Sequence, residues 1–257
     1  MTAQPPDFGL TASDYARHRA GFPVELLDRL AARGIAGPDA RVVDLGTGTG
    51  SLARLFAQRG CEVTGVDIAQ SLIEQARRLD REAAVQIDYV ERPAEATGLP
   101  GRAFDVVSAG QCWHWFDRPA AAREVARLLV SGGAVVIAHF DWLPITGNVV
   151  ATTERVILRY NPEWPFADRA GLYPRWLTDL QTAGFRDIET FSFDVMVSYS
   201  HEAWVGRVRA SAPIAGTLQA DAVQACSNEL TAILRESFPE DPLAVPHRIW
   251  AVTARAA

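Results

Sequence analysis

Two aspartates, each at the end of a predicted buried strand, are the residues in this sequence best suited to ligand chemistry. Asp44 precedes the turn Gly46-Thr47-Gly48-Thr49-Gly50, and Asp67 ends the next β-branched run. A strand that leads into a glycine turn and then a helix can hold a nucleotide-like ligand, because glycine permits close backbone approach and the helix N-terminus offers unpaired N–H groups. A carboxylate at the position of Asp67 can accept both hydroxyls of a ribose.

The glycine spacing indicates which nucleotide-like ligand fits. A dinucleotide fingerprint has glycine or alanine three residues after its second glycine, and Ser51 stands three residues after Gly48. Asp44 would repel a pyrophosphate but attract the ammonium group of an amino acid. The pattern therefore disfavours an NAD-dependent oxidoreductase and favours a ligand that joins a nucleoside to an amino acid.

Four stretches of the chain, over about residues 41–140, resemble the successive motifs of class I S-adenosylmethionine-dependent methyltransferases. In order they are DLGTGTG, GVDIAQSLIEQAR, AEATGLPGRAFDVVSAGQCWHWF and ARLLVSGGAVVIA. The resemblance implies an α/β, Rossmann-like fold with a seven-stranded, mostly parallel sheet of order 3-2-1-4-5-7-6, an antiparallel last strand and helices on both faces. It also implies S-adenosyl-L-methionine as cofactor and S-adenosyl-L-homocysteine as product.

Alternating strand and helix patterns agree with such a sheet. Strands are predicted at 41–45, 62–67, 85–91, 104–109, 133–140, 185–197 and 247–254, and helices at 24–32, 50–59, 69–79, 118–129, 148–160, 174–183, 201–210 and 219–236. We expect one methyltransferase domain over residues 1–257. Its parts are an N-terminal helical cover (1–40), a cofactor-binding core (41–140), an aromatic, helical insert with a linking helix (141–184) and a C-terminal part that completes the sheet (185–257).

The resemblance also assigns cofactor contacts. Gly46, Thr47 and Gly48 would surround the methionine part, with Asp44 acting on its ammonium, directly or through water. Asp67 would accept the ribose hydroxyls, although an aspartate there also suits a helix N-cap. The remaining contacts are Ile68 packed on the adenine, Ala94 and Glu95 beside the adenine edge, Gln111 at the methionine moiety, and Tyr15 and Arg19 from the N-terminal helix.

The loop after the fourth predicted strand lies where α/β sheets bind ligands. His114 in this loop is the candidate catalytic residue, because an imidazole can take a proton from a hydroxyl near neutral pH. It could equally hydrogen-bond a carboxylate substrate, which needs no base, or simply pack among Trp113, Trp115 and Phe116. His139 and Asp141 lie on one face of the fifth strand, but no further acid completes a metal site, so no metal is predicted.

Trp113, Trp142 and Arg207 are the candidate substrate residues. The tryptophan-rich insert indicates a closed apolar pocket with a few polar groups, and a guanidinium would suit a carboxylate; a surface arginine is the alternative. The Tyr15-Arg19 pair, with Gly21-Phe22-Pro23 after it, and the sequence 113–116 resemble methyltransferases that esterify small polycarboxylates. We therefore expect a small organic acceptor, methylated on oxygen (carboxylate or hydroxyl).

Composition limits the partners. The 257 residues carry a formal charge of −6 and no block of lysine and arginine, which disfavours nucleic acid as a partner. Three widely spaced cysteines give neither a disulfide framework nor a zinc motif. No apolar stretch is long enough for a membrane span or a leader, so we expect a cytoplasmic monomer or homodimer without a membrane partner.

Two alternatives remain open at this stage. A regulatory protein could bind S-adenosylmethionine or S-adenosylhomocysteine and catalyse nothing. A methyltransferase acting on nitrogen, on carbon or on a macromolecule would keep the same glycine turn. The Asn-Pro-Pro-Tyr type of tetrapeptide used by amino-methylating enzymes is absent after the fourth strand, where Gly110-Gln111-Cys112-Trp113 stands instead.

Overall fold

The computed structural model describes residues 20–165, 167–211, 213–214 and 216–257. In these residues seven strands form one sheet of order β3-β2-β1-β4-β5-β7-β6, which confirms the predicted order. The strands are β1 (Arg41–Leu45), β2 (Glu62–Asp67), β3 (Asp88–Glu91), β4 (Phe104–Gly110), β5 (Leu129–Trp142), β6 (Arg186–Tyr199) and β7 (Leu243–Arg255). Tyr15, Arg19 and the helix expected around them lie outside the described residues.

The strand directions follow from the pairing. β1 lies between β2 and β4, and β2–β3, β1–β2, β1–β4 and β4–β5 are all parallel. β7 runs antiparallel to β5, because Ala256 N donates to Gly133 O whereas Leu143 N donates to Pro246 O. Parallel neighbours bring the carboxyl ends of β1, β2 and β4 to one edge of the sheet, which is where α/β folds bind ligands.

The contacts group the chain into two compact units. The sheet unit comprises Gly21–Phe140, Tyr173–Ser192 and Ile249–Ala257, and the helical unit comprises Ala20, Asp141–Leu172 and Phe193–Arg248. The boundary falls within β5, β6 and β7. Each unit is described separately below.

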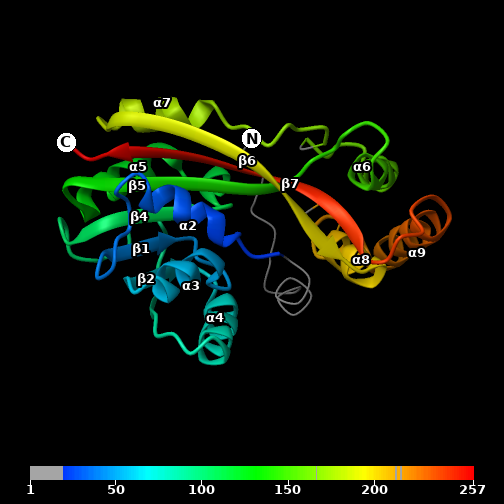
Figure 1. The fold of residues 1–257 in the computed structure, drawn as a ribbon, viewed down its shortest axis with the longest axis horizontal. Coiled ribbons are helices and arrows are strands. Elements are labelled where there is room, and N and C mark those ends of the chain that lie inside the picture. Colours follow the sequence, from blue (N-terminus) through cyan, green and yellow to red (C-terminus); the bar gives the residue numbers. More distant parts are fainter. Residues whose placement is uncertain (1–19, 166, 212, 215) are drawn as a thin grey trace. The chain divides into compact units, whose positions relative to one another are not determined.

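The sheet unit has helices on both faces. They are α2 (Val24–Ala31), α3 (Ser51–Gln58), α4 (Gln70–Glu82), the short 3₁₀ turn η2 (Trp113–Trp115), α5 (Arg118–Leu128) and α7 (Arg175–Thr182). α5 and α7 pack together, as do α2 and α3 (Figure 1). Val43 and Leu45 of β1 belong to the core under α5 and α7. Because side chains alternate along a strand, the equally buried Val42 must face the opposite side.

The helical unit contains α6 (Val149–Tyr160), α8 (His201–Arg209) and α9 (Ala220–Ser237). α9 packs against both α6 and α8 (Figure 1). Their apolar faces share one core that includes Ile157, Trp204 and Leu230. Asn148 Oδ1 accepts from Ala151 N at 2.8 Å to cap α6, and Ser200 Oγ accepts from Ala203 N at 3.1 Å to cap α8. These polar residues satisfy N–H groups that the first turn leaves unpaired.

Three strands begin three or four residues away from their predicted starts. β5 begins at Leu129 rather than 133, because Leu129 pairs with Phe104 before a register shift; the Gly132-Gly133 pair bends the strand without ending it. β7 begins at Leu243 rather than 247 and includes Pro246, whose carbonyl oxygen accepts from Leu143 N. β3 begins at Asp88 rather than 85, because α4 continues to Glu82 and the chain then turns through Ala84 at φ 54°.

Within the described residues, no helix combines the length and the apolar character that crossing a membrane requires. In the same part of the chain, no group of three or more His, Cys, Asp and Glu residues is arranged to hold a metal ion.

Candidate functional site

The glycine turn after β1 is the centre of the candidate site in the sheet unit. Gly46, Gly48 and Gly50 all have positive φ, at 60°, 57° and 76°, a region that L side chains avoid. A Cβ on Gly46 would lie 2.9 Å from both Cys112 Sγ and the ring of Phe116, whereas a Cβ on Gly48 would meet no atom within 4 Å. Gly46 is therefore required by packing, and Gly48 leaves open space beside the turn.

Asp44 is buried under this turn, with 1% of its surface exposed. Its Oδ1 accepts a hydrogen bond from Ser108 Oγ at 2.6 Å. Burial raises the pKa of Asp44 to about 6, against the lowering effect of hydrogen bonds from Ser108 and Thr47, and repulsion from Asp67 adds to the rise. An aspartate in such surroundings would gain from a cationic ligand, because a nearby positive charge favours its ionised form.

Asp67, at the end of β2, holds the turn in place. Its Oδ2 accepts from Gly48 N at 2.8 Å, and its Oδ1 accepts from Ala69 N at 2.9 Å. Ala69, not Asp67, is the N-cap residue of α4. Each carboxylate oxygen keeps a further lone pair for a hydroxyl. The neighbouring Ile68 is 66% exposed, which is unusual for so large an apolar side chain.

Thr47 has a buried hydroxyl that lacks a regular partner. Its side chain is 7% exposed, and Oγ1 makes no hydrogen bond of normal geometry. The hydroxyl nevertheless lies near enough to Asp44 to lower the pKa of that carboxyl. A buried polar atom without a partner costs free energy unless a ligand supplies one.

Three side chains that the sequence analysis did not identify form a hydrogen-bond network that reaches the glycine turn. Arg54 Nε donates to Asp80 Oδ1 at 3.0 Å, and Arg54 Nη2 donates to Thr49 O at 2.8 Å. Tyr89 Oη donates to Asp80 Oδ2 at 2.8 Å. A Cβ on Gly50 would lie 2.7 Å from Tyr89 Oη, and a Cβ on Gly65 would lie 2.6 Å from Cε1 of the Tyr89 ring. No local motif reveals this network, because its members lie on α3, α4 and β3.

Ala94 and Glu95 lie in the loop after β3. Ala94 is buried in the core of the sheet unit. The Glu95 carboxylate is half-buried and accepts from Asp117 N at 2.8 Å, and Asp117 in turn accepts from Ala120 N to cap α5. Glu95 thus fastens this loop to the start of α5.

Gln111 and Trp113 follow β4. Gln111 has φ 59°, and its side-chain Nε2 donates to the carbonyl of Phe140. Trp113 is fully buried in the core, and its Nε1 donates to Asp179 Oδ2 at 3.1 Å. The observed position of Trp113 is that of a packing residue that anchors the loop to α7.

His114 forms a pair with His139. His114 Nδ1 lies 3.3 Å from His139 Nε2, so a proton on one nitrogen is shared with the other and the tautomer sets which ring donates. His114 packs on Trp115, with ring centroids 4.5 Å apart, and the buried His139 packs on Tyr173 at 4.2 Å and Trp176 at 5.1 Å. The sequence identified His139 only with Asp141; its neighbours from 173–176 could not be foreseen.

Trp142 and Arg207 come together in the helical unit. The guanidinium carbon of Arg207 lies 4.9 Å from the centre of the Trp142 ring. Trp142 Nε1 donates to Glu154 Oε1 at 2.9 Å. The sequence gave no reason to pair these two residues, since 65 positions separate them along the chain.

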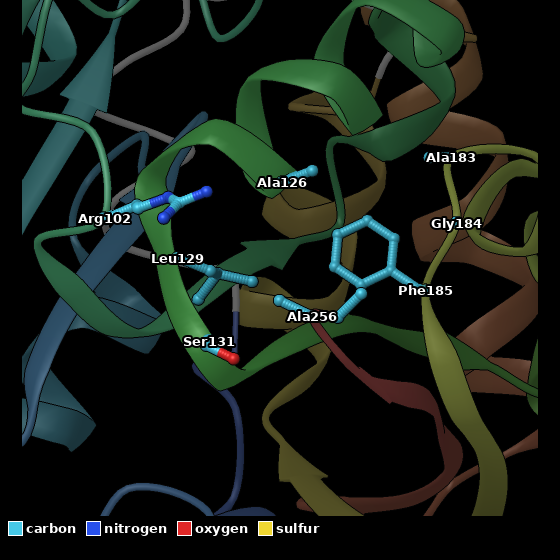
Figure 2. A pocket seen from close by; sticks show the side chains of 9 residues that line it. Arg102, Ala126, Leu129, Ser131, Ala183, Gly184, Phe185 and Ala256 are labelled. Atoms are coloured by element: carbon cyan, nitrogen blue, oxygen red, sulfur yellow. The ribbon is translucent and has the colours of Figure 1, made fainter.

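A separate pocket of about 280 Å³ lies in the sheet unit near the first residues of β4 and β5 (Figure 2). This is the opposite end of these strands from Gly110 and Gln111. Figure 2 shows the ring of Phe185 on one side and Arg102 on another. The pocket is lined by Arg102, Ala126, Leu129, Ser131, Ala183, Gly184, Phe185, Ala256 and Ala257, a set without the acid-base groups that the glycine turn gathers.

The part of the chain that contains the glycine turn is similar to known proteins. The family profile described as "Methyltransferase domain" matches residues 43–137. The chain is 35% identical, over 152 residues, to an uncharacterised methyltransferase of Mycobacterium tuberculosis; the match covers 56% of this chain and 58% of that relative. The activity of the whole relative therefore does not transfer directly.

Two further similarities extend over more of the chain. A ubiquinone biosynthesis O-methyltransferase of Xanthomonas campestris is 32% identical over 188 residues, which are 72% of this chain and 76% of that relative. A solved structure of a protein proposed to be a type II methyltransferase, from Anaeromyxobacter dehalogenans, superimposes with a TM-score of 0.70 at 23% identity, over 93% of this chain and 98% of that one. The similarity to the Xanthomonas protein extends over most of both sequences. The similarity to the Anaeromyxobacter structure shows the fold.

Proposed function

Since the chain belongs to the class I S-adenosylmethionine-dependent methyltransferases, we propose that it transfers a methyl group to an oxygen atom of a small organic acceptor. The observation that carries this proposal is the convergence of two buried carboxylates, Asp44 and Asp67, on one glycine turn. The two acids offer separate recognition of a cationic amino group and of a ribose diol, which S-adenosylmethionine combines in one molecule.

The residues around the turn fit this cofactor. Asp44 would hold the ammonium group, Asp67 would accept the ribose hydroxyls, and the exposed Ile68 would pack on the adenine. The buried Thr47 hydroxyl, which has no regular hydrogen bond among the described residues, would gain a partner. Gly48 leaves space for close approach. Ala94, Glu95 and Gln111 are proposed as the further contacts at the adenine edge and the methionine moiety; Tyr15 and Arg19 stay proposals from the sequence.

The chemistry asked of the protein is mainly alignment. The cofactor supplies a methyl group on a positively charged sulfur, which is already a good leaving group. An acceptor oxygen forms a bond to the methyl carbon as the carbon–sulfur bond breaks, so oxygen, carbon and sulfur must be held in line. Gln111, fixed by its hydrogen bond to Phe140 O, and the rigid Gly46 turn would provide that geometry.

The histidine pair would allow His114 either to remove a proton from an acceptor or to donate a hydrogen bond to it. With the proton on His114 Nδ1 shared toward His139, His114 Nε2 would be a base that removes the proton of a hydroxyl acceptor. With the proton on His139 Nε2, His114 would instead donate from Nε2 to a carboxylate acceptor, which has no proton to lose. His114 is thus proposed to act on the acceptor and His139 to position His114.

The choice of oxygen rests on two observations. The Xanthomonas relative is named an O-methyltransferase, and the Asn-Pro-Pro-Tyr type of tetrapeptide used by amino-methylating enzymes does not follow β4. The choice of a small acceptor rests on the tryptophan-rich insert, which indicates a closed apolar pocket; the lack of a basic block in a sequence of net charge −6 argues only against a nucleic-acid acceptor.

Calorimetry with S-adenosylmethionine and S-adenosylhomocysteine tests the proposal. Asp67→Ala removes two charged hydrogen-bond acceptors of a diol, so we expect the dissociation constant to rise by about 100-fold or more. Asp88→Ala, which changes an exposed aspartate of the same unit, is the matched control and should bind as the wild type does. Release of S-adenosylhomocysteine in the presence of pooled small carboxylates and phenols then tests turnover.

Three results would contradict the proposal. Failure of the wild type to bind either ligand would exclude the methyltransferase function, whatever the sequence similarity. Binding that Asp67→Ala leaves intact would exclude the proposed cofactor site. Tight binding without turnover on any oxygen acceptor would favour the regulatory alternative.

A further inference from the structure

Arg207 is a charged side chain of the helical unit that forms no ion pair with the described residues. It lies on α8, is half-buried, and stacks on Trp142 at 4.9 Å. Burial lowers its pKa, which Asp141 and Tyr199 partly offset. Although Asp141 attracts it, no carboxylate of the described residues lies within the 4.0 Å of an ion pair. A buried charge that lacks a counter-ion reduces stability, so its retention needs a reason.

The tryptophan under this guanidinium is fixed from several sides. Trp142 Nε1 donates to Glu154 Oε1 at 2.9 Å, and the Trp142 ring packs edge-on against Trp204 with centroids 5.3 Å apart. Trp204 is itself buried, and its Nε1 donates to Thr153 Oγ1 at 2.9 Å. The platform therefore orients Arg207 in advance, and little side-chain entropy remains to be lost on binding.

The buried Tyr199 hydroxyl is a second polar group beside Arg207, and it makes no hydrogen bond of normal geometry with the described residues. It lies near enough to the guanidinium to raise the pKa of Arg207. Tyr199 stacks on His247, whose pKa burial lowers to about 4 and whose Nδ1 lies 3.0 Å from Val245 O. His247 is thus neutral at pH 7, and the local positive charge belongs to Arg207.

We propose that Arg207 and Tyr199 bind a carboxylate group of a small organic ligand. The planar guanidinium can donate two parallel hydrogen bonds to a carboxylate, and the Tyr199 hydroxyl can supply a third. A single guanidinium with Asp141 in its vicinity suits one negative charge better than a phosphate, which carries nearly two at neutral pH. The identification of this ligand as the methyl acceptor rests on the function proposed above; the carboxylate site itself does not.

Calorimetry with succinate and benzoate as probes tests the site, with succinamide and benzamide as their neutral counterparts and inorganic phosphate as the competing anion. The wild type should bind the carboxylates and not the amides. Arg207→Met should weaken carboxylate binding by at least about tenfold, the loss expected for one charge-assisted pair, and Tyr199→Phe by a smaller factor. Arg155→Met, which removes an exposed arginine of the same unit, should bind as the wild type does.

Stability measurements separate a binding role from a structural one. If Arg207 serves a ligand, Arg207→Met should not lower the midpoint of thermal unfolding without ligand, and succinate or benzoate should raise that midpoint in the wild type but not in the variant. A large fall in the midpoint of Arg207→Met would make Arg207 structural. Arg207→Lys, which keeps the charge but loses the planar fork, should also weaken binding.

Several outcomes overturn the proposal: no carboxylate binding to the wild type at the highest soluble concentration, equal binding to Arg207→Met, equal binding of the amides, or tighter binding of phosphate than of either carboxylate. S-adenosylmethionine binding is measured on the same preparations. Its failure would refute the proposed function, whereas failure of the carboxylates alone would refute this site.

Discussion

The two units of the molecule each bury charged side chains, but they compensate them differently. In the sheet unit, Asp80 accepts hydrogen bonds from both Arg54 and Tyr89, and Asp44 is bonded to Ser108. In the helical unit, Arg207 has the face of Trp142 and the distant attraction of Asp141, without an ion pair among the described residues. The buried Arg54–Asp80 pair is satisfied within its own unit, whereas Arg207 has no ion pair among the described residues.

The two units therefore differ in how far their own residues supply the hydrogen bonds of the proposed binding residues. The glycine turn is held by backbone and side-chain partners before any ligand arrives, since Asp67 accepts from Gly48 N and Ala69 N. Such a turn can bind the same cofactor without rearrangement. At Arg207, the carboxylate ligand proposed above would supply hydrogen bonds that the described residues of the helical unit do not.

The largest predicted effect is on the buried ion pair below the glycine turn. Asp80→Asn leaves the Arg54 guanidinium buried without its counter-ion, so the free energy of unfolding should fall by about 3–5 kcal/mol. Urea denaturation measures this change in the free energy of unfolding. Asp105→Asn, which breaks the exposed pair with Arg41 in the same unit, is the control and should cost less than about 1 kcal/mol.

The same comparison predicts the opposite result for Arg207→Met, whose ligand-free stability should not fall. If Asp80→Asn and Arg207→Met lowered the free energy of unfolding by similar amounts, the contrast between the two units would be wrong.

A matched pair of glycine substitutions separates packing from ligand space. Gly46→Ala places a Cβ 2.9 Å from Cys112 Sγ at a positive φ, so we expect a loss of about 2–4 kcal/mol in the free energy of unfolding. Gly48→Ala has the positive φ but no neighbour within 4 Å, and should cost only about 1 kcal/mol.

The methyl group that Gly48→Ala introduces would occupy the space proposed for the cofactor. The affinity of this variant for S-adenosylmethionine should therefore fall by about tenfold or more. Urea denaturation and calorimetry on the two variants measure both effects. Wild-type affinity in Gly48→Ala would mean that the ligand does not approach this side of the turn.

The smallest predicted effect is a pH dependence from Asp44. Burial raises its pKa in the ligand-free protein to about 6, and a bound ammonium group would lower it again. Affinity for S-adenosylmethionine should therefore be fully present above pH 7 and fall as pH decreases through 6, by about tenfold at pH 5.

Calorimetry at several pH values measures this dependence, with Asp44→Asn as the control that should bind weakly and with less dependence on pH between 5 and 7. Equal slopes in the wild type and in Asp44→Asn would assign the titration to another group.

The sequence predicted most of the elements because their signals are local. The strand at 41–45 and the strand at 62–67 have the predicted bounds, since β-branched runs ended by glycine or aspartate leave little choice. The starts of β3, β5 and β7 were misplaced, because α4 continues to Glu82 and because β5 and β7 include Gly132-Gly133 and Pro246. Pairing with a neighbouring strand overrides such local signals.

The sequence by itself determined the glycine turn with its two aspartates, because residues 44–50 and Asp67 lie in short motifs whose spacing fixes their meaning. The order of the strands was implied only by the resemblance to class I methyltransferases that those motifs carry. Only the tertiary structure decided that Ser108 bonds Asp44, that His139 meets His114, and that Trp142 and Tyr199 surround Arg207. These partners are separated by 8 to 65 positions along the chain. Burial and missing hydrogen bonds are properties of the folded surroundings, and residue type alone does not encode them.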